Sequence, residues 1–170
     1  MNLKKNLVFL GMMGSGKSSI GYLVSKKLNL KFVDIDSKIE EETGMKILNI
    51  FSEKGEKFFR NLEEKVTLKI LKTNNTVISL GGGAFINDKI RKEILTNHNS
   101  FWLNWDLEIL LKRIKNSKKR PIAFNATDNE LVDLIKKRSN IYSKALYEIK
   151  CDNISKKEIV NKILKIYENH

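Results

Sequence analysis

Five short segments with strand-like patterns stand out along the chain, separated by longer segments in which apolar residues recur every three to four positions. These segments predict five β-strands, and the first is a short apolar run of the kind typical of a buried strand. They cover residues 6–10, 31–35, 76–80, 101–105 and 147–151. The first run ends at Gly11, as expected of a strand that leads into a turn.

The segments between these runs predict helices. Ile20, Leu23, Val24 and Leu28 recur at the spacing of one buried helical face. The other predicted helices cover about 55–72, 107–114, 130–142 and a terminal segment. Residues 37–40 and 155–158 have the spacing of capping boxes and predict two helix starts. The alternation predicts an α/β fold with a mostly parallel five-stranded sheet covered by helices on both faces, in a single domain over residues 1–170.

The composition excludes several classes of protein. No apolar stretch is long enough for a membrane span, and the one near the N-terminus is too short for a signal peptide, so we expect a cytoplasmic protein. The lone Cys151 excludes an internal disulfide, and His98 and His170 are too few for a zinc cluster. The net charge of +12 indicates an anionic partner: nucleic acid, a membrane surface or a small acidic metabolite.

Residues 11–18 match the phosphate-binding pattern G-x-x-x-x-G-K-[ST], between a predicted strand and a predicted helix. The glycines allow backbone N–H groups to turn toward a phosphate, and the helix that follows adds the positive end of its dipole. We expect Lys17 to bind the β- and γ-phosphates of ATP and Ser18 to ligate Mg²⁺. The sequence therefore predicts a nucleotide-binding protein.

The acceptor of the phosphoryl group should bind near the carboxyl ends of the strands, where open α/β sheets bind ligands. Asp34 and Asp36 lie at the end of the second predicted strand. A carboxylate there can organise the outer coordination sphere of Mg²⁺, orient an attacking hydroxyl, or only cap the next helix. Asp34 is the candidate nearer the metal. Gly81, Gly82 and Gly83 follow the third strand and suit either a close approach of backbone to ligand or a flexible turn.

Only five of the 32 basic residues are arginines, at positions 60, 91, 113, 120 and 138. A guanidinium can bind a carboxylate or phosphate through two parallel hydrogen bonds, so each arginine is a candidate ligand. Arg60 has Glu63 three residues further along the same helical face, a pair that fits either a binding site or a surface ion pair. The scattered lysines indicate a solvated surface rather than a stripe that binds nucleic acid.

Taken together, these motifs resemble those of bacterial shikimate kinases over nearly the whole chain. The matching motifs are the phosphate loop, Asp34-Ile35-Asp36, Phe59-Arg60-x-x-Glu63, Gly81-Gly82-Gly83, Arg120-Pro121 and Lys137-Arg138-x-x-x-Tyr142. The resemblance implies a three-layer P-loop kinase fold. It also implies transfer of the γ-phosphoryl group of ATP to the 3-hydroxyl of shikimate, a step of aromatic amino-acid (chorismate) biosynthesis, with Mg²⁺ as cofactor.

The same resemblance implies roles for individual residues. Arg60 and Arg138 would bind the shikimate carboxylate, while Asp36 would orient the 3-hydroxyl and accept its proton. Further substrate contacts are implied for Gly81, Gly82, Gly83, Phe51 and Phe59. Nucleotide contacts are implied for Gly14, Ser15, Gly16, Lys17, Ser18, Ser19, Arg113, Arg120 and Ser155.

Two regions follow from the resemblance: a shikimate-binding helical region at about 34–64 and a lid at about 115–127. Arg120 in the lid would close over the phosphates and, with Lys17, stabilise the transferring phosphoryl group. The chain departs from the family in small ways. Ser19 replaces a more usual threonine, residues 122–123 of the lid replace more usual leucines, and residues 152–155 match the adenine loop only loosely.

Two other functions stay open on these residues. A P-loop kinase for another hydroxy acid, such as gluconate, would share Lys17 and Ser18 but need not combine Asp36, Arg60 and Arg138. The charge of +12 and the basic segment 115–120 also fit a nucleotide-dependent nucleic-acid binder. We nevertheless expect a monomer that acts on shikimate and ATP and binds neither nucleic acid nor membranes.

Overall fold

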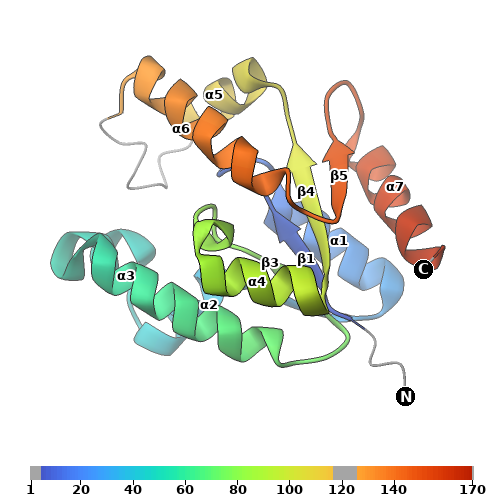
Figure 1. Cartoon of the computed structure of the whole chain (residues 1–170), viewed down its shortest axis with the longest axis horizontal. Helices are drawn as coiled ribbons and strands as arrows, with labels where there is room; N and C mark the ends of the chain where they lie inside the picture. Colours follow the sequence, from blue (N-terminus) through green and yellow to red (C-terminus); the bar gives the residue numbers. More distant parts are fainter. Residues whose placement is uncertain (1–4, 117–125, 170) are drawn as a thin grey trace.

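Five parallel strands form the centre of the computed structural model, which describes residues 5–116 and 126–169 (Figure 1). The strands are β1 (Leu7–Leu10), β2 (Lys31–Asp34), β3 (Thr76–Ser79), β4 (Asn99–Asn104) and β5 (Tyr147–Lys150). Their order is β2-β3-β1-β4-β5, and every neighbouring pair is parallel. The predicted α/β fold with a five-stranded parallel sheet is therefore confirmed, with the strand before the phosphate loop at its centre.

Helices cover both faces of this sheet. They are α1 (Lys17–Leu28), α2 (Ile35–Thr43), α3 (Ile47–Leu71), η1 (Ala84–Ile86), α4 (Asp88–Asn97), α5 (Leu107–Lys115), α6 (Asp128–Tyr142) and α7 (Lys156–Glu168). Helices α1 and α7 pack on one face against Leu7 and Phe9, and α3, α4, α5 and α6 pack on the other against Val8 and Leu10 (Figure 1). Successive strand side chains point to opposite faces, so β1 contributes to both cores.

The buried face of α1 differs from its prediction at one position. Leu23 is 40% exposed, whereas Ile20 and Val24 are buried. Gly21 lies on the buried face instead, where a Cβ atom would be only 3.0 Å from the ring of Phe32. The missing side chain allows α1 to approach the sheet closely, and this orientation turns Leu23 outward. The prediction that Leu23 faces the core is wrong.

The start of α2 also differs from its prediction. The N-cap is Asp34, whose carboxylate accepts a hydrogen bond from the Ser37 N–H at 3.1 Å. The capping box expected at residues 37–40 is therefore wrong, and the helix begins inside the predicted second strand. Glu40 accepts hydrogen bonds from the Ile47 N–H at 3.0 Å and from Lys46 at 2.8 Å. Through these bonds, Glu40 of α2 holds the start of α3 in place.

The apolar pattern misses two helical segments. Helix α3 begins at Ile47 rather than near residue 55, because Gly55, with φ 82°, kinks the helix and interrupts the pattern. Helix α4 buries only Ile90 and Ile94, too few apolar residues to show a helical period. Its N-cap, Asn87, accepts hydrogen bonds from two N–H groups of the first turn.

The last two helices both begin at capping boxes. In the predicted one, the Ser155 hydroxyl accepts from the Glu158 N–H at 3.2 Å, and the Glu158 carboxylate accepts from the Ser155 N–H at 2.7 Å. Thr127 and Glu130 form a second box, which was not predicted from the sequence and which starts α6 at Asp128. Within the part of the chain that the structure describes, no helix is long and apolar enough to cross a membrane.

His98, which caps the C-terminal end of α4, is a buried histidine that should make stability depend on pH. Its side chain is 8% exposed, and neither ring nitrogen has a hydrogen-bond partner among residues 5–116 and 126–169. Burial lowers the pKa of His98; Glu93 partly opposes this shift, and Lys5 adds to it. As the pH falls, the unfolded chain therefore binds a proton before the folded chain does, and the folded state loses stability.

We expect the free energy of unfolding to fall as the pH decreases through about 6.5, the ordinary pKa of histidine. In His98→Leu, which removes the titrating ring, this fall should be smaller. Denaturant unfolding of both proteins at pH values on each side of that pKa measures the difference. If the free energy of unfolding depends on pH in the same way in both proteins, His98 does not contribute to the pH dependence.

Candidate active site

Two adjoining pockets lie at the edge of the sheet where the parallel strands end. The phosphate loop lines one of them, and residues of α2, α3, α6 and the glycine turn after β3 line the other. Asp36 and Ile47 line both pockets, so the two are parts of one cleft. Open α/β sheets bind their ligands in this place.

The phosphate loop connects β1 to α1. Gly14 and Gly16 have φ values of 78° and 89°, which favour glycine over any other residue. Lys17 is the first residue of α1, and its ammonium group donates hydrogen bonds to the carbonyl oxygens of Gly11 and Met12, both at 2.9 Å. The lysine side chain therefore folds back over the loop and brings its charge to the anion-binding turn.

The structure brings the predicted phosphate-loop residues together. Those that line the pocket are Gly14, Gly16, Lys17, Ser18 and Ser19. Ser19 donates to the Gly16 carbonyl at 3.0 Å, and Ser15 is buried within the loop. The helix dipole and the lysine charge act on the same pocket, which suits a polyphosphate.

Ser18 and Asp34 form the place at which a metal ion could bind. The Ser18 hydroxyl donates to the Asp34 carboxylate at 2.5 Å and lies 3.4 Å from the Ser79 hydroxyl. These are hard oxygen atoms of the kind that Mg²⁺ prefers, and a kinase usually binds Mg²⁺ through one or two protein oxygens together with water and phosphate. Outside residues 1–4, 117–125 and 170, no group of three or more His, Cys, Asp or Glu side chains could hold a metal. The donor set therefore fits an ion shared with a nucleotide.

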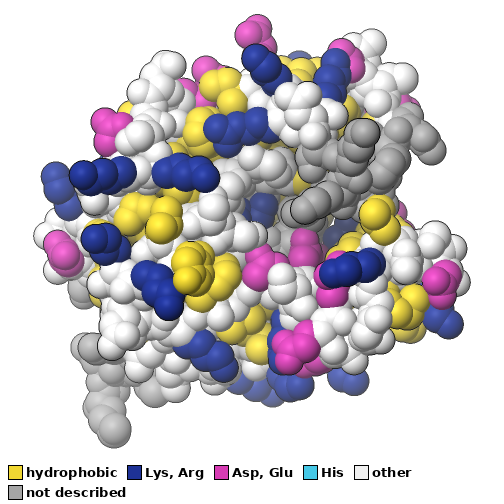
Figure 2. Space-filling model, turned by 180° about the vertical axis from the view of Figure 1, so that it is seen from behind, with side chains coloured by type: hydrophobic (Ala, Val, Ile, Leu, Met, Phe, Trp, Pro, Cys, Tyr) yellow, Lys and Arg dark blue, Asp and Glu magenta, His cyan; other side chains and the backbone are white. Residues whose placement is uncertain are grey.

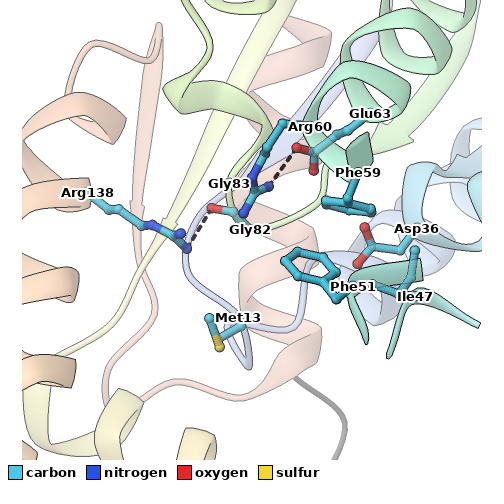
Figure 3. Close-up of a pocket in the computed structure, with 10 residues that line it drawn as sticks. All are labelled: Met13, Asp36, Ile47, Phe51, Phe59, Arg60, Glu63, Gly82, Gly83 and Arg138. Carbon is cyan, nitrogen blue, oxygen red and sulfur yellow. Dashed lines mark hydrogen bonds and ion pairs between the residues drawn. The ribbon is translucent and has the colours of Figure 1, made fainter. Parts of the chain in front are cut away.

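A cavity lies beside the phosphate loop (Figure 3). The predicted acceptor residues in its walls are Asp36, Phe51, Phe59, Arg60, Gly82, Gly83 and Arg138. Met13, Ile47 and Glu63 complete the lining. Figure 3 shows Arg138 across the cavity from Asp36, with the Arg60–Glu63 pair between them.

Arg60 and Glu63 form a partly buried pair, not the surface ion pair that the sequence left open. Arg60 Nη1 lies 2.7 Å from Glu63 Oε2, and the Glu63 side chain is 3% exposed. Burial raises the pKa of Glu63, although the Arg60 charge opposes this shift. Burial disfavours the charge on Arg60, but Glu63 and Glu56 more than offset this effect and raise its pKa. The guanidinium is therefore charged and held in one orientation.

An aromatic wall supports the same guanidinium. The rings of Phe51 and Phe59 lie with their centroids 4.6 Å apart. The Cζ atom of Arg60 is 5.2 Å from the Phe59 centroid and 5.9 Å from that of Phe51. Cations are attracted to aromatic faces at such distances. The cavity thus combines an apolar wall with a fixed positive charge.

Gly81 does not line the cavity, but it allows two acidic side chains to approach each other. A Cβ atom on Gly81 would lie 2.5 Å from Glu63 Oε1 and 2.7 Å from Asp36 Oδ1, so a larger residue would displace these carboxylates. Burial is the main cause of the raised pKa of Glu63, and the nearby Asp36 adds to it. The glycine turn therefore determines where both carboxylates lie.

Helix α6 binds the glycine turn from the other side. Arg138 Nη1 donates to the Gly82 carbonyl at 3.4 Å, and the Tyr142 hydroxyl donates to the same oxygen. Burial raises the pKa of Tyr142 to about 12, so its hydroxyl keeps the proton that it donates at neutral pH. The glycine turn is thus supported from α6 by the arginine and the tyrosine of the motif Lys137-Arg138-x-x-x-Tyr142.

Arg113 and Trp105 lie against the outer side of the phosphate loop. Arg113 Nη1 donates to the Gly14 carbonyl at 3.3 Å, and Trp105 Nε1 donates to the Ser15 carbonyl at 2.9 Å. The sequence motifs indicate Arg113 but not Trp105. Its position directly after β4, at the edge of the sheet where ligands bind, is the signal that could have identified it.

The predicted nucleotide contacts Arg113 and Ser155 do not line the cleft. Ser155 caps α7 and is absent from the lining of both pockets. Its contact with adenine stays a prediction. Arg120 and most of the predicted lid at 115–127 lie outside the described residues.

Known proteins are similar to this chain in sequence and in fold. The family described as "Shikimate kinase" matches residues 13–168. A shikimate kinase of Persephonella marina is 39% identical over 160 residues, covering 94% of this chain and 97% of the relative. The structure of the shikimate kinase from Acinetobacter baumannii in complex with shikimate has a TM-score of 0.91 at 29% identity and covers 98% of this chain and 94% of that chain. The Aquifex aeolicus shikimate kinase has a TM-score of 0.86 at 34% identity and covers 96% of each chain.

Proposed function

This chain belongs to the shikimate kinase family, and we infer that it transfers the γ-phosphoryl group of ATP to the 3-hydroxyl of shikimate, giving shikimate 3-phosphate and ADP. The observation that carries this function is the cavity lined by Asp36, Arg60 and Arg138 beside the phosphate loop. Shikimate has one carboxylate and three hydroxyls. It therefore needs cations at one end and a hydrogen-bond acceptor at the other, and the cavity offers both.

Arg60 and Arg138 bind the shikimate carboxylate in this proposal. Arg60 is already held by Glu63 at 2.7 Å and by the aromatic wall, so little conformational freedom is lost when the substrate binds. Arg138 is 8% exposed and approaches from α6. Two charge-assisted contacts to one carboxylate would orient the ring as well as hold it.

Asp36 acts on the hydroxyl that attacks. It lines both the acceptor cavity and the phosphate-loop pocket, so it lies between the two substrates. Its carboxylate accepts a hydrogen bond from the 3-hydroxyl and takes the proton as that oxygen bonds to the γ-phosphorus and the bond to the ADP oxygen breaks. Lys17 stabilises the negative charge of the transferring group.

An enzyme of this family that uses ATP needs a divalent metal ion, and we propose that the ion is Mg²⁺. Ser18 would bind it directly and Asp34 through water, because the two side chains lie within 2.5 Å of each other at the phosphate loop. When bound, Mg²⁺ neutralises charge on the β- and γ-phosphates.

Several further points stay predictions of the family resemblance. They are the lid role of Arg120, the adenine contact of Arg113, action as a monomer in the cytoplasm, and the division of the single domain 1–170 into a helical region at about 34–64 and a lid at about 115–127.

Gly83→Ala tests the proposed carboxylate site. A Cβ atom there would lie 2.5 Å from Arg60 Nη1 and 2.8 Å from Arg60 Cζ. The guanidinium ends a flexible side chain, so we expect it to move away while the protein stays folded. Partial loss of a charged hydrogen bond should raise the KM for shikimate by about 10-fold, with the KM for ATP unchanged. Steady-state kinetics and a melting curve measure this. An unchanged KM for shikimate would contradict the assigned place of Arg60.

An ADP-release assay over a panel of acceptors tests the function itself. Shikimate should stimulate ADP release far above the hydrolysis of ATP alone, whereas gluconate, the acceptor of the rival kinase, should not. Gluconate lacks the rigid ring that a cavity walled by Phe51 and Phe59 suits. Stimulation by gluconate but not by shikimate would refute the proposed substrate.

The rival function in nucleic-acid binding has less support from the surface. On the face shown in Figure 2, Lys and Arg side chains lie scattered among acidic and uncharged ones rather than in one continuous stripe. Titration with random-sequence DNA and RNA at physiological salt should show only weak binding. Tight binding that weakens steeply with salt would favour the rival.

A further inference from the structure

Trp105 has no role in the proposed reaction, yet it binds the loop that should hold the phosphates. Its indole N–H donates to the Ser15 carbonyl at 2.9 Å. Its ring also supports Arg113, whose Cζ atom lies 3.7 Å from the ring centroid and whose Nη1 donates to the Gly14 carbonyl at 3.3 Å. Two consecutive carbonyl groups of the phosphate loop are thus held from outside by a pair of stacked side chains.

The direction of these bonds matters for anion binding. In a trans peptide the C=O of one residue and the N–H of the next point in opposite directions. A donor that holds the Ser15 carbonyl from outside therefore turns the Gly16 N–H the other way. Gly16 has φ 89° and caps α1, in the middle of the phosphate-binding pattern. Glycine has more backbone freedom than other residues, so a hydrogen bond from outside the loop is needed to hold this peptide in one orientation.

Trp105 is itself firmly held. It directly follows β4, and the backbone on each side of it is bonded to the neighbouring segment. The Asn104 carbonyl accepts from the Cys151 N–H at 2.9 Å, and the Asp106 N–H donates to the Asp152 carboxylate at 2.8 Å. The indole therefore acts from a rigid support, which is what precise placement of a binding group requires.

We propose that Trp105 is a positioning residue of the nucleotide site, which holds the Ser15–Gly16 peptide in its phosphate-binding orientation and fixes Arg113 beside the loop. The proposal rests on the proposed function in one respect, namely that the loop binds the phosphates of ATP. It assigns Trp105 an effect on the nucleotide and none on shikimate.

Trp105→Phe separates the hydrogen bond from the stacking, because phenylalanine keeps an aromatic ring but has no N–H. We expect calorimetric titration with Mg·ADP, without any acceptor, to show affinity weaker by about 3- to 10-fold, the range of one neutral hydrogen bond. The KM for ATP should rise similarly, and the KM for shikimate should not change. Trp105→Leu also removes the aromatic ring that supports Arg113, so its affinity for Mg·ADP should fall further than that of Trp105→Phe.

Tyr22→Phe is the matched control. It also removes one polar group from an aromatic ring, on the exposed side of α1, where Tyr22 is 48% exposed and contacts Phe32 and Lys26. Its affinity for Mg·ADP should equal that of the unchanged protein. Melting curves of all variants show whether they fold.

Two results would overturn the proposal: Mg·ADP affinity of Trp105→Phe equal to that of the unchanged protein, or equal losses for ADP and shikimate, which would indicate a general structural role. A wrong proposed function would give a different result: the unchanged protein would release no ADP in response to shikimate. The Mg·ADP titrations would still show whether Trp105 affects nucleotide binding.

Discussion

Replacing Asp36 with asparagine is expected to lower kcat by about 10²- to 10⁴-fold, the usual contribution of a positioned acid or base to a proton transfer. Asparagine has nearly the same shape and can still contact the 3-hydroxyl, but it cannot accept the proton. Because Asp36 lines both pockets of the cleft, the change acts at the point where the two substrates meet. Coupled ADP release at saturating ATP and shikimate measures kcat.

Asp133→Asn is the control for that experiment. Asp133 is an exposed carboxylate on α6, so its loss changes the net charge equally and should leave kcat unaltered. Titration with Mg·ADP should show that Asp36→Asn still binds nucleotide. A kcat for Asp36→Asn within about 10-fold of the unchanged enzyme would show that Asp36 is not the group that takes the proton.

The second large effect is expected for Arg60→Ala, which should raise the KM for shikimate by about 10- to 100-fold. This is the range for loss of a hydrogen bond between charged groups. Binding of ATP should be largely kept, because Arg60 lines the acceptor cavity and not the phosphate-loop pocket. Steady-state kinetics with each substrate varied in turn separates the two constants.

This variant needs its own control, because removal of Arg60 leaves Glu63 buried without its partner. A buried unpaired carboxylate destabilises a protein. The double variant Arg60→Ala/Glu63→Gln removes that charge, so it should regain melting temperature without regaining affinity for shikimate. A parallel rise of both KM values in Arg60→Ala, or recovery of the KM for shikimate in the double variant, would contradict the assigned role.

The sequence predicts the sheet well, because the central strands β1, β3 and β4 are short segments of mostly buried residues. The third predicted strand, for example, covers 76–80, and β3 spans Thr76–Ser79. Helices are predicted less well, since their exposed faces and short lengths leave weaker patterns. Helix α4 has only two buried apolar residues, and in α1 the close contact of Gly21 with Phe32 decides which face is inward. Such contacts depend on tertiary packing.

In the candidate site, too, some residues could be predicted from the sequence and some contacts could not. Motifs select Asp36, Arg60 and Arg138, and the structure brings them into one cavity, although their individual roles stay proposals. The packing of Glu63 against Gly81 and the anchoring of the loop by Trp105 join segments far apart in the chain. No local pattern contains such contacts, so only the folded structure reveals them.

The most direct test of the central claim is to identify the phosphorylated product. The purified protein, incubated with ATP, Mg²⁺ and shikimate, should yield ADP and one new phosphate ester in equal amounts. Phosphorus and proton NMR of that ester should show coupling between phosphorus and the proton on carbon 3 of the ring. Release of ADP with only inorganic phosphate, or an ester at another hydroxyl, would contradict the proposed reaction.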